Sequence, residues 1–189
     1  MRIIGGTHRG LALAEVGAGD LAARLRPTGD RVRESLFNLL QHGPGGDPVP
    51  GARVLDLFAG TGALGLEALS RGAASAVFVD DGAAARALLR RNIERMRAQG
   101  VTRVWRRDAT RLGENRGAPF TLAFLDPPYG RDLGARALSA AVAGGWLAQG
   151  ATVVWEENAP QIPPPGFSPL DTRRYGETWL TLLRHAPAP

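Results

Sequence analysis

The sequence contains no cysteine in 189 residues. This absence excludes disulfide bonds, thiolate metal ligands and a thiol nucleophile. Long apolar runs are also missing, since none approaches the roughly 18 residues that a membrane-spanning helix needs, and the start MRIIGGTHRG lacks an apolar targeting segment. We therefore expect a cytoplasmic protein that has no membrane partner.

Lysine is missing as well, so the 23 strongly basic side chains are all arginine and the formal net charge is +5. Arginine binds phosphate through two parallel hydrogen bonds and stacks on bases, which favours a nucleic-acid partner. A coding bias toward arginine and alanine would explain the same composition. The three histidines, His8, His42 and His185, do not have the spacing of metal ligands, so we expect no metal site.

One core is expected for a chain of this length. A Gly/Pro-rich segment, GPGGDPVPG at 43–51, predicts a boundary between an appendage at 1–50 on the substrate side and a main domain at 51–185, with a frayed tail at 186–189. In the appendage, RIIGGTHRGLALAEV predicts a hairpin, and RPTGDRVRESLFNLL predicts a helix capped by Thr28 or Asp30. The apolar face of that helix comprises Val32, Leu36, Leu39 and Leu40.

After residue 51, strand and helix patterns alternate. Short apolar runs (RVLDLF, SAVFVD, VTRVWRR, FTLAFLD and ATVVWEE) are separated by helical segments near 62–71, 83–98 and 132–143, with Gly72 and Gly100 as the expected ends of the first two helices. This pattern predicts a doubly wound α/β fold with a mostly parallel sheet. The last two runs, FSPLDTRRYG and ETWLTLLRH, have no helix between them and predict an antiparallel hairpin at the sheet edge.

The segment GTGALG at 60–65 matches the glycine pattern of dinucleotide-binding loops, a weak signal by itself. The preceding strand, VLDLF, places Asp56 where it would repel a pyrophosphate. S-adenosylmethionine instead carries a sulfonium and an ammonium group that a carboxylate attracts. Asp80, at the end of SAVFVD, is placed to bind its ribose hydroxyls, although Asp80 or Asp81 capping the next helix would explain the same position.

A second motif, Asp126-Pro127-Pro128-Tyr129, directly follows the strand FTLAFL. The two prolines stiffen the loop. The Asp126 carboxylate and the Pro127 carbonyl can accept hydrogen bonds from an exocyclic amine of a base and aim its lone pair at a methyl donor, while Tyr129 offers a stacking face. Methylation at carbon 5 of a pyrimidine generally needs a cysteine nucleophile, which is missing. The alternative is a tight turn without chemistry.

Together, VLDLFAGTGALGLEALSRGA and DPPY resemble the class I S-adenosylmethionine-dependent amino-methyltransferases, and RIIGG with RPTGDRVRESLFNLL and RYGETWLTLLR resembles the RsmD family. The resemblance implies a Rossmann-like fold and methylation of N2 of one guanine in bacterial 16S ribosomal RNA, of the type at position 966. It also implies 16S rRNA as partner, within a small-subunit assembly particle, and we expect a monomer. An adenine-N6 methyltransferase acting on DNA or RNA and a non-catalytic nucleic-acid-binding protein remain alternatives, whereas no acid–base pair suggests hydride transfer.

The resemblance also assigns residues. For S-adenosylmethionine these are Asp56, Phe58, Ala59, Gly60, Thr61, Gly62, Asp80, Asp108 and Ala109, with Asp108 near the adenine amino group. The catalytic residues are Asp126, Pro127, Pro128 and Tyr129, and the RNA contacts are Arg9, Arg26, Pro27, Thr28 and Arg31. Thr61 stands where the family usually has serine, and the hairpin HRGLAL is less basic than is usual.

The remaining arginines and the tryptophans receive structural expectations. Arginines on the helix at 83–98 are expected on its solvated face: Arg86, Arg90, Arg91, Arg95 and Arg97. Those expected to contact phosphate are Arg9, Arg24, Arg26, Arg31 and Arg33. Expected in the core or partly buried are Trp105, Trp146, Trp155 and Trp179.

Overall fold

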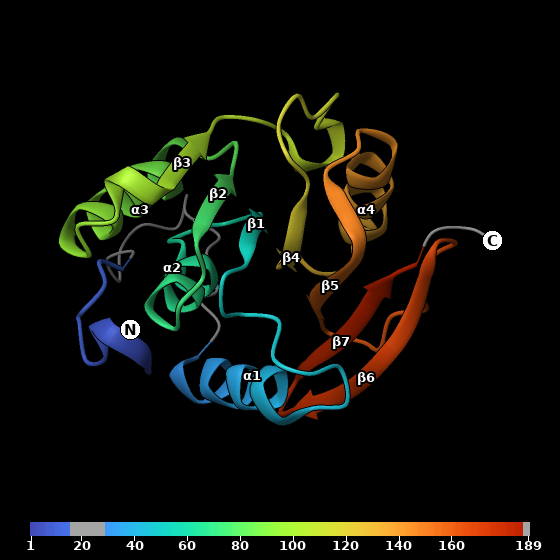
Figure 1. Ribbon diagram of the computed structural model, residues 1–189, viewed down its shortest axis with the longest axis horizontal. Helices are drawn as coiled ribbons and strands as arrows, with labels where there is room; N and C mark the ends of the chain where they lie inside the picture. The colour runs from blue at the N-terminus through green and yellow to red at the C-terminus, as the bar shows by residue number, and fades with distance from the viewer. Residues whose placement is uncertain (16–28, 187–189) are drawn as a thin grey trace.

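The computed structural model describes residues 1–15 and 29–186, and its centre is one seven-stranded sheet with the order β3-β2-β1-β4-β5-β7-β6 (Figure 1). The parallel strands are β1 (Arg53–Leu57), β2 (Ser75–Val79), β3 (Thr102–Trp105), β4 (Phe120–Leu125) and β5 (Leu147–Glu157). β6 (Phe167–Tyr175) and β7 (Thr178–His185) form an antiparallel hairpin that pairs with β5 through β7. The predicted doubly wound α/β fold with a C-terminal antiparallel hairpin is confirmed.

Within the described residues, the helices packed on the sheet are α1 (Asp30–His42), α2 (Ala63–Ser70), α3 (Ala83–Arg95) and α4 (Leu133–Ala143). Short 3-10 turns are η1 (Gly6–His8), η2 (Gln99–Val101) and η3 (Ala109–Arg111). Alternating side chains of β1 face opposite layers, because Val54 belongs to the apolar cluster that holds residues of α1, α2 and α3, and Leu55 to the cluster that holds residues of α4. Asp56, two residues after Val54, therefore faces the α2 side.

The predicted hairpin at the start of the chain forms with irregular geometry. We call residues 1–15 the N-terminal hairpin. Arg2 and Ala12 form an antiparallel bridge, and the Ile3 and Gly10 amides donate to the Leu11 and Ile3 carbonyls at 2.9 and 2.8 Å. Gly6 and Gly10 have φ angles of 76° and 87°, which only glycine adopts easily, and they divert the chain into η1 in place of two regular strands.

Two predictions about helix ends are wrong. The N-cap of α1 is Gly29, and Asp30 is the first helical residue, while Thr28 lies outside the described residues. α3 ends at Arg95, and Arg97 with a φ of 54° takes the left-handed position that Gly100 was expected to fill. Gly72, with a φ of 104° after the C-cap Arg71, does follow α2 as predicted.

The tryptophans lie as expected, since Trp146 and Trp155 are buried and Trp105 and Trp179 half-buried. The expectation for Arg86 is wrong, because its side chain is buried and its Nη1 donates to the Asp80 carbonyl at 3.1 Å. A guanidinium is tolerated in such a place when carbonyls accept its protons. The other four arginines of that set are exposed.

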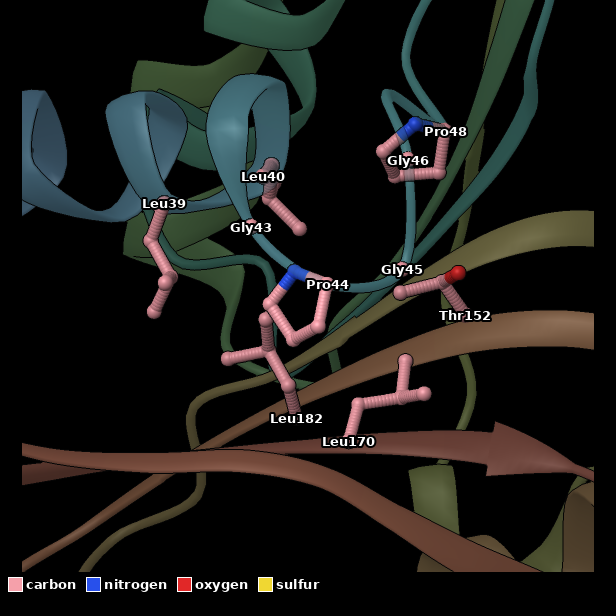
Figure 2. Close-up of a pocket in the computed structure, with 10 residues that line it drawn as sticks. All are labelled: Leu39, Leu40, Gly43, Pro44, Gly45, Gly46, Pro48, Thr152, Leu170 and Leu182. Atoms are coloured by element: carbon pink, nitrogen blue, oxygen red, sulfur yellow. The ribbon is translucent and has the colours of Figure 1, made fainter.

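A shallow apolar pocket lies between the end of α1, the loop at 43–48 and the strands β5, β6 and β7 (Figure 2). Its floor includes Thr152, which pairs with Leu122 near the start of β4. Arg184 fastens the loop by donating to the Gly45 carbonyl at 2.9 Å. The pocket thus lies at the amino-terminal half of β4 and β5, away from the carboxyl ends of the strands.

Candidate active site

The two sequence motifs begin side by side at the carboxyl edge of the sheet. Leu57, the last residue of β1, pairs with Leu125, the last residue of β4, and the Asp126 amide donates to the Leu57 carbonyl at 3.5 Å. The strand order reverses at this pair, because β1 continues toward β2 and β4 toward β5. Ligands of open α/β sheets bind at such a switch point.

Residues 58–62, the glycine loop, leave β1 in an unusual backbone conformation. Phe58, Gly60 and Gly62 have φ angles of 59°, 55° and 79°. The φ of Gly62 favours glycine, and a Cβ there would also lie 2.3 Å from Leu89 Cδ1 of α3, which would have to move. A left-handed phenylalanine is strained, and such strain concentrates at functional sites.

Asp56 is an acid with only 2% of its surface exposed. Its Oδ2 accepts a hydrogen bond from the Gly65 amide in the first turn of α2 at 2.9 Å. Burial raises the pKa of Asp56 to about 8; the Gly65 hydrogen bond lowers that pKa, and the nearby Asp80 charge raises it. A cationic ligand at this position would offset the cost of ionising the buried carboxyl group.

Asp80 joins the glycine loop to the turn after β2. Its Oδ2 accepts from the Gly60 amide at 2.8 Å and its Oδ1 from the Gly82 amide at 2.7 Å. Burial raises the pKa of Asp80, and these two amides partly offset the shift. The N-cap residue of α3 is Gly82, so neither Asp80 nor Asp81 occupies the cap position, but Asp80 accepts the Gly82 amide and thereby also holds the start of that helix.

Asp108 and Ala109 follow β3 at the same edge. The Asp108 side chain is 47% exposed, and its Oδ1 accepts from the amide and the hydroxyl of Thr110 at 2.8 and 2.7 Å. These hydrogen bonds lower the pKa of Asp108 and keep the carboxylate charged at the start of η3. Ala109 is buried beneath it.

The D-P-P-Y loop, residues 126–129, is anchored by a contact that the sequence motif did not reveal. The Tyr129 hydroxyl donates to Glu156 Oε1 at 2.9 Å, and Glu156 on β5 is 3% exposed. Burial and the Glu156 charge raise the pKa of Tyr129, so the phenol stays neutral. Asp126 is half-buried and Pro127 buried. The signal that was missed is the acidic pair at the end of the apolar run VVWEE.

The residues predicted to contact RNA differ in their exposure, and some lie outside the described residues. Arg9 and Arg31 are exposed, whereas Arg24, Arg26, Pro27 and Thr28 lie outside the described residues. The prediction for Arg33 is wrong, because the side chain is fully buried. Its guanidinium donates to the Arg2 carbonyl and to Asp30, and forms an ion pair with Glu67.

Glu67 is a second functional candidate that the sequence motifs missed. The side chain lies fully buried in α2 and accepts hydrogen bonds from the Ile4 and Gly5 amides and from Arg71 Nε, each at 2.8 Å. An acid in the middle of the apolar helix ALGLEALS was the available signal. Glu67 therefore fastens the N-terminal hairpin to the helix that follows the glycine loop.

Comparison with known proteins decides the family. A family model described as "Conserved hypothetical protein 95" matches residues 1–184. Ribosomal RNA small subunit methyltransferase D of Escherichia coli (strain K12) is 40% identical over 171 residues, which cover 89% of this chain and 81% of the relative. The chain belongs to the RsmD family.

Further members of the family agree. The methyltransferase D of Haemophilus influenzae is 32% identical over 181 residues, covering 93% of this chain and 89% of the relative. A solved structure described as "Putative methyltransferase yhhF from Escherichia coli" superposes with a TM-score of 0.82 and 34% identity, covering 100% of this chain and 99% of that one. No helix in residues 1–15 and 29–186 is long and apolar enough to cross a membrane, and no cluster of potential metal ligands occurs there.

Proposed function

We propose that this chain transfers a methyl group from S-adenosylmethionine to N2 of a guanine in 16S ribosomal RNA. One observation carries the proposal: the glycine loop, flanked by the acids Asp56 and Asp80, and the D-P-P-Y loop begin on neighbouring strands, joined by the hydrogen bond from the Asp126 amide to the Leu57 carbonyl. A donor at the first loop and an amine at the second would be adjacent. The names of the relatives support the methyl-transfer chemistry and the RNA substrate.

The side chains at the edge fit S-adenosylmethionine better than a dinucleotide. The pKa values of the buried Asp56 and the half-buried Asp80 are both raised by desolvation, and both would gain from a ligand that brings positive charge or hydroxyl donors. A pyrophosphate at this edge would be repelled by these two carboxylates. Residues 58–62 contain no cationic side chain that could offset the repulsion. When bound, the cofactor supplies an electrophilic methyl group on a sulfonium.

At the target base, Asp126 and the Pro127 carbonyl would accept the two N–H bonds of the amine. The nitrogen lone pair then leaves conjugation with the ring and points at the methyl group. Alignment of this kind contributes about 7–11 kcal/mol to lowering a barrier. The cofactor would supply the methyl group and keep the electron pair of its C–S bond on sulfur, and Asp126, the carboxylate that already accepts a hydrogen bond from the amine, would take the released amine proton.

Tyr129 would hold the base in that position. The hydrogen bond to Glu156 fixes the ring, and stacking of a base on an aromatic ring contributes about 1–3 kcal/mol. The hydrogen bond restrains the ring before the base arrives, so less side-chain freedom is lost on binding. Glu156 is therefore proposed as a positioning residue for Tyr129.

The finer parts of the proposal concern the RNA. The expected target is the guanine of the 966 type, reached within a small-subunit assembly particle by a monomeric enzyme. Arg9 and Arg31 are exposed and available for phosphate. A substrate of this kind agrees with the cytoplasmic location expected from the sequence.

Calorimetry with S-adenosylmethionine and with NAD tests the choice of cofactor. We expect micromolar binding of S-adenosylmethionine, on the order of −8 kcal/mol, and no binding of NAD. Tight binding of NAD without binding of S-adenosylmethionine would refute the proposal. Transfer of labelled methyl groups to small-subunit RNA tests the reaction itself.

A further inference from the structure

Asn92, on α3, is a buried amide that no sequence motif singled out. The residue is fully buried and makes three hydrogen bonds to backbone groups. Its Oδ1 accepts from the Ala14 amide at 2.6 Å, and its Nδ2 donates to the Ala14 carbonyl at 3.2 Å. The same Nδ2 donates to the Thr61 carbonyl in the glycine loop at 2.9 Å.

Through these contacts of Asn92, the N-terminal hairpin helps to hold the glycine loop in place. The two N–H donors and the oxygen acceptor of the Asn92 side chain are all used only while Ala14 lies against Asn92, since two of the three hydrogen bonds go to Ala14. Loss of docking would leave a buried amide with unused polar atoms, which is costly. Thr61 also contacts the hairpin directly, because its Oγ1 lies 3.8 Å from Met1 Sδ.

The geometry points to Asn92 as a positioning residue that couples the N-terminal hairpin to the cofactor loop, so that docking of the hairpin and binding of S-adenosylmethionine favour each other. This inference rests on the proposed function. It goes beyond that function because Asn92 lies behind the loop and acts through the Thr61 carbonyl, which is next to the left-handed Gly60 and Gly62.

Reciprocal coupling follows from linkage. If the hairpin carries RNA contacts such as Arg9, a cofactor that stabilises the docked hairpin must raise the affinity for RNA, and RNA must raise the affinity for the cofactor by the same factor. Asn92 carries part of that factor, because it bonds to both the hairpin and the glycine loop.

Asn92→Ala is the direct variant, and Arg95→Gln is its matched control. Arg95 Nη1 donates to the Ala12 carbonyl of the same hairpin at 3.2 Å, but no hydrogen bond from Arg95 to the glycine loop occurs among the described residues. We expect Asn92→Ala to weaken binding of S-adenosylhomocysteine, measured by calorimetry, about tenfold or more, and Arg95→Gln to change it less than about twofold. The KM for S-adenosylmethionine should rise in Asn92→Ala, while kcat at saturating cofactor stays within about threefold.

A second measurement separates coupling from a purely structural role: the ratio of the RNA affinity with S-adenosylhomocysteine to the RNA affinity without it. A purely structural role of Asn92 would leave this ratio unchanged. This ratio should exceed one in the wild type and in Arg95→Gln, and approach one in Asn92→Ala. Unchanged cofactor affinity in Asn92→Ala, or an unchanged ratio, overturns the inference. Because a wild type that binds no cofactor would instead refute the proposed function, the two failures are distinguishable.

If Asn92→Ala does not fold, hydrogen exchange of the wild-type protein tests the coupling instead. Addition of S-adenosylhomocysteine should slow exchange in a peptide that contains the Ala14 amide, the donor to Asn92. Exchange in this peptide that is the same with and without the ligand would overturn the coupling.

Discussion

At the scale of single residues, Asp56 is an acid whose ionisation opposes folding. Its pKa is raised from 3.8 to about 8, so the folded state binds the proton more tightly than the unfolded state does. The contribution of protonated Asp56 to the free energy of unfolding is fully present below pH 4 and is lost as the pH rises through about 8. Its size is on the order of a few kcal/mol. Asp80, whose pKa is also raised, acts in the same direction.

The first prediction concerns this pH dependence. The melting temperature of the cofactor-free protein should fall between about pH 5 and pH 8.5, and Asp56→Asn should make that fall clearly smaller. Asp81→Asn, which changes an exposed carboxylate beside the same edge, serves as the control. Thermal unfolding followed by circular dichroism measures both, and an equal fall in Asp56→Asn and the wild type would contradict the assignment.

Asp126 is the residue on which the proposed chemistry depends most. Asp126→Ala removes the acceptor for the amine protons, so we expect methyl transfer to drop by at least about a thousandfold while cofactor affinity stays within about threefold. Asp132→Asn alters an exposed acid in the left-handed conformation that asparagine tolerates, and should retain activity. Retained transfer in Asp126→Ala, measured with labelled cofactor, would refute the role.

Tyr129 allows stacking and positioning to be separated. Tyr129→Ala removes the ring and should lower the rate about ten- to hundredfold, in line with the stacking energy. Tyr129→Phe keeps the ring and loses the hydrogen bonds of the hydroxyl, among them the one to Glu156, so a loss of less than about tenfold is expected. Single-turnover kinetics would measure both variants, and equal losses would show that the ring itself does not stack.

At the scale of elements, the described segments near the site are fastened by buried polar side chains. Glu67 of α2 receives the Ile4 and Gly5 amides of the N-terminal hairpin and contacts the guanidinium groups of Arg33 and Arg71. Arg71 in turn lies over the Phe37 ring of α1, with its Cζ 4.9 Å from the ring centroid. The hairpin, α1 and α2 are thus joined at one buried carboxylate.

Glu67→Gln should therefore destabilise the protein strongly. The amide cannot neutralise Arg33, and loss of one partner of a buried ion pair costs about 3–5 kcal/mol. The exposed acid of α1 provides the control, because Glu34→Gln should change the free energy of unfolding by less than about 0.5 kcal/mol. Urea unfolding of the two variants measures the difference, and equal stabilities would contradict this role of Glu67.

The sequence predicts this fold well because its signals are local. Apolar runs such as VLDLF and FTLAFL report strands buried on both faces, and Gly62 and Asp126 stand at their carboxyl ends for reasons visible within a few residues. Asn92 and Glu156 were missed because their partners are far away in sequence, 78 residues for Ala14 and 27 for Tyr129. Arg33 and Arg86 were misplaced because a pattern of charges does not reveal which guanidinium finds buried acceptors.

At the scale of the whole molecule, the net charge of +5 and the exposed arginines predict RNA binding that depends on salt. Affinity should fall steeply as salt increases, and Arg9→Gln and Arg31→Gln should each reduce the slope of log affinity against log salt by about one. Arg91→Gln, on the exposed face of α3, should leave the slope unchanged. A flat response to salt, measured by filter binding, would contradict the phosphate contacts.

The central claim is methylation of guanine N2 in 16S RNA, and mapping of the transferred methyl group tests it most directly. Small-subunit particles and naked RNA from cells that lack the gene would be incubated with the protein and tritiated S-adenosylmethionine, then digested and analysed as nucleosides and fragments. The account predicts N2-methylguanosine at a single position, and no labelling of particles from wild-type cells. N6-methyladenosine as the product, or no transfer to either substrate, would contradict it.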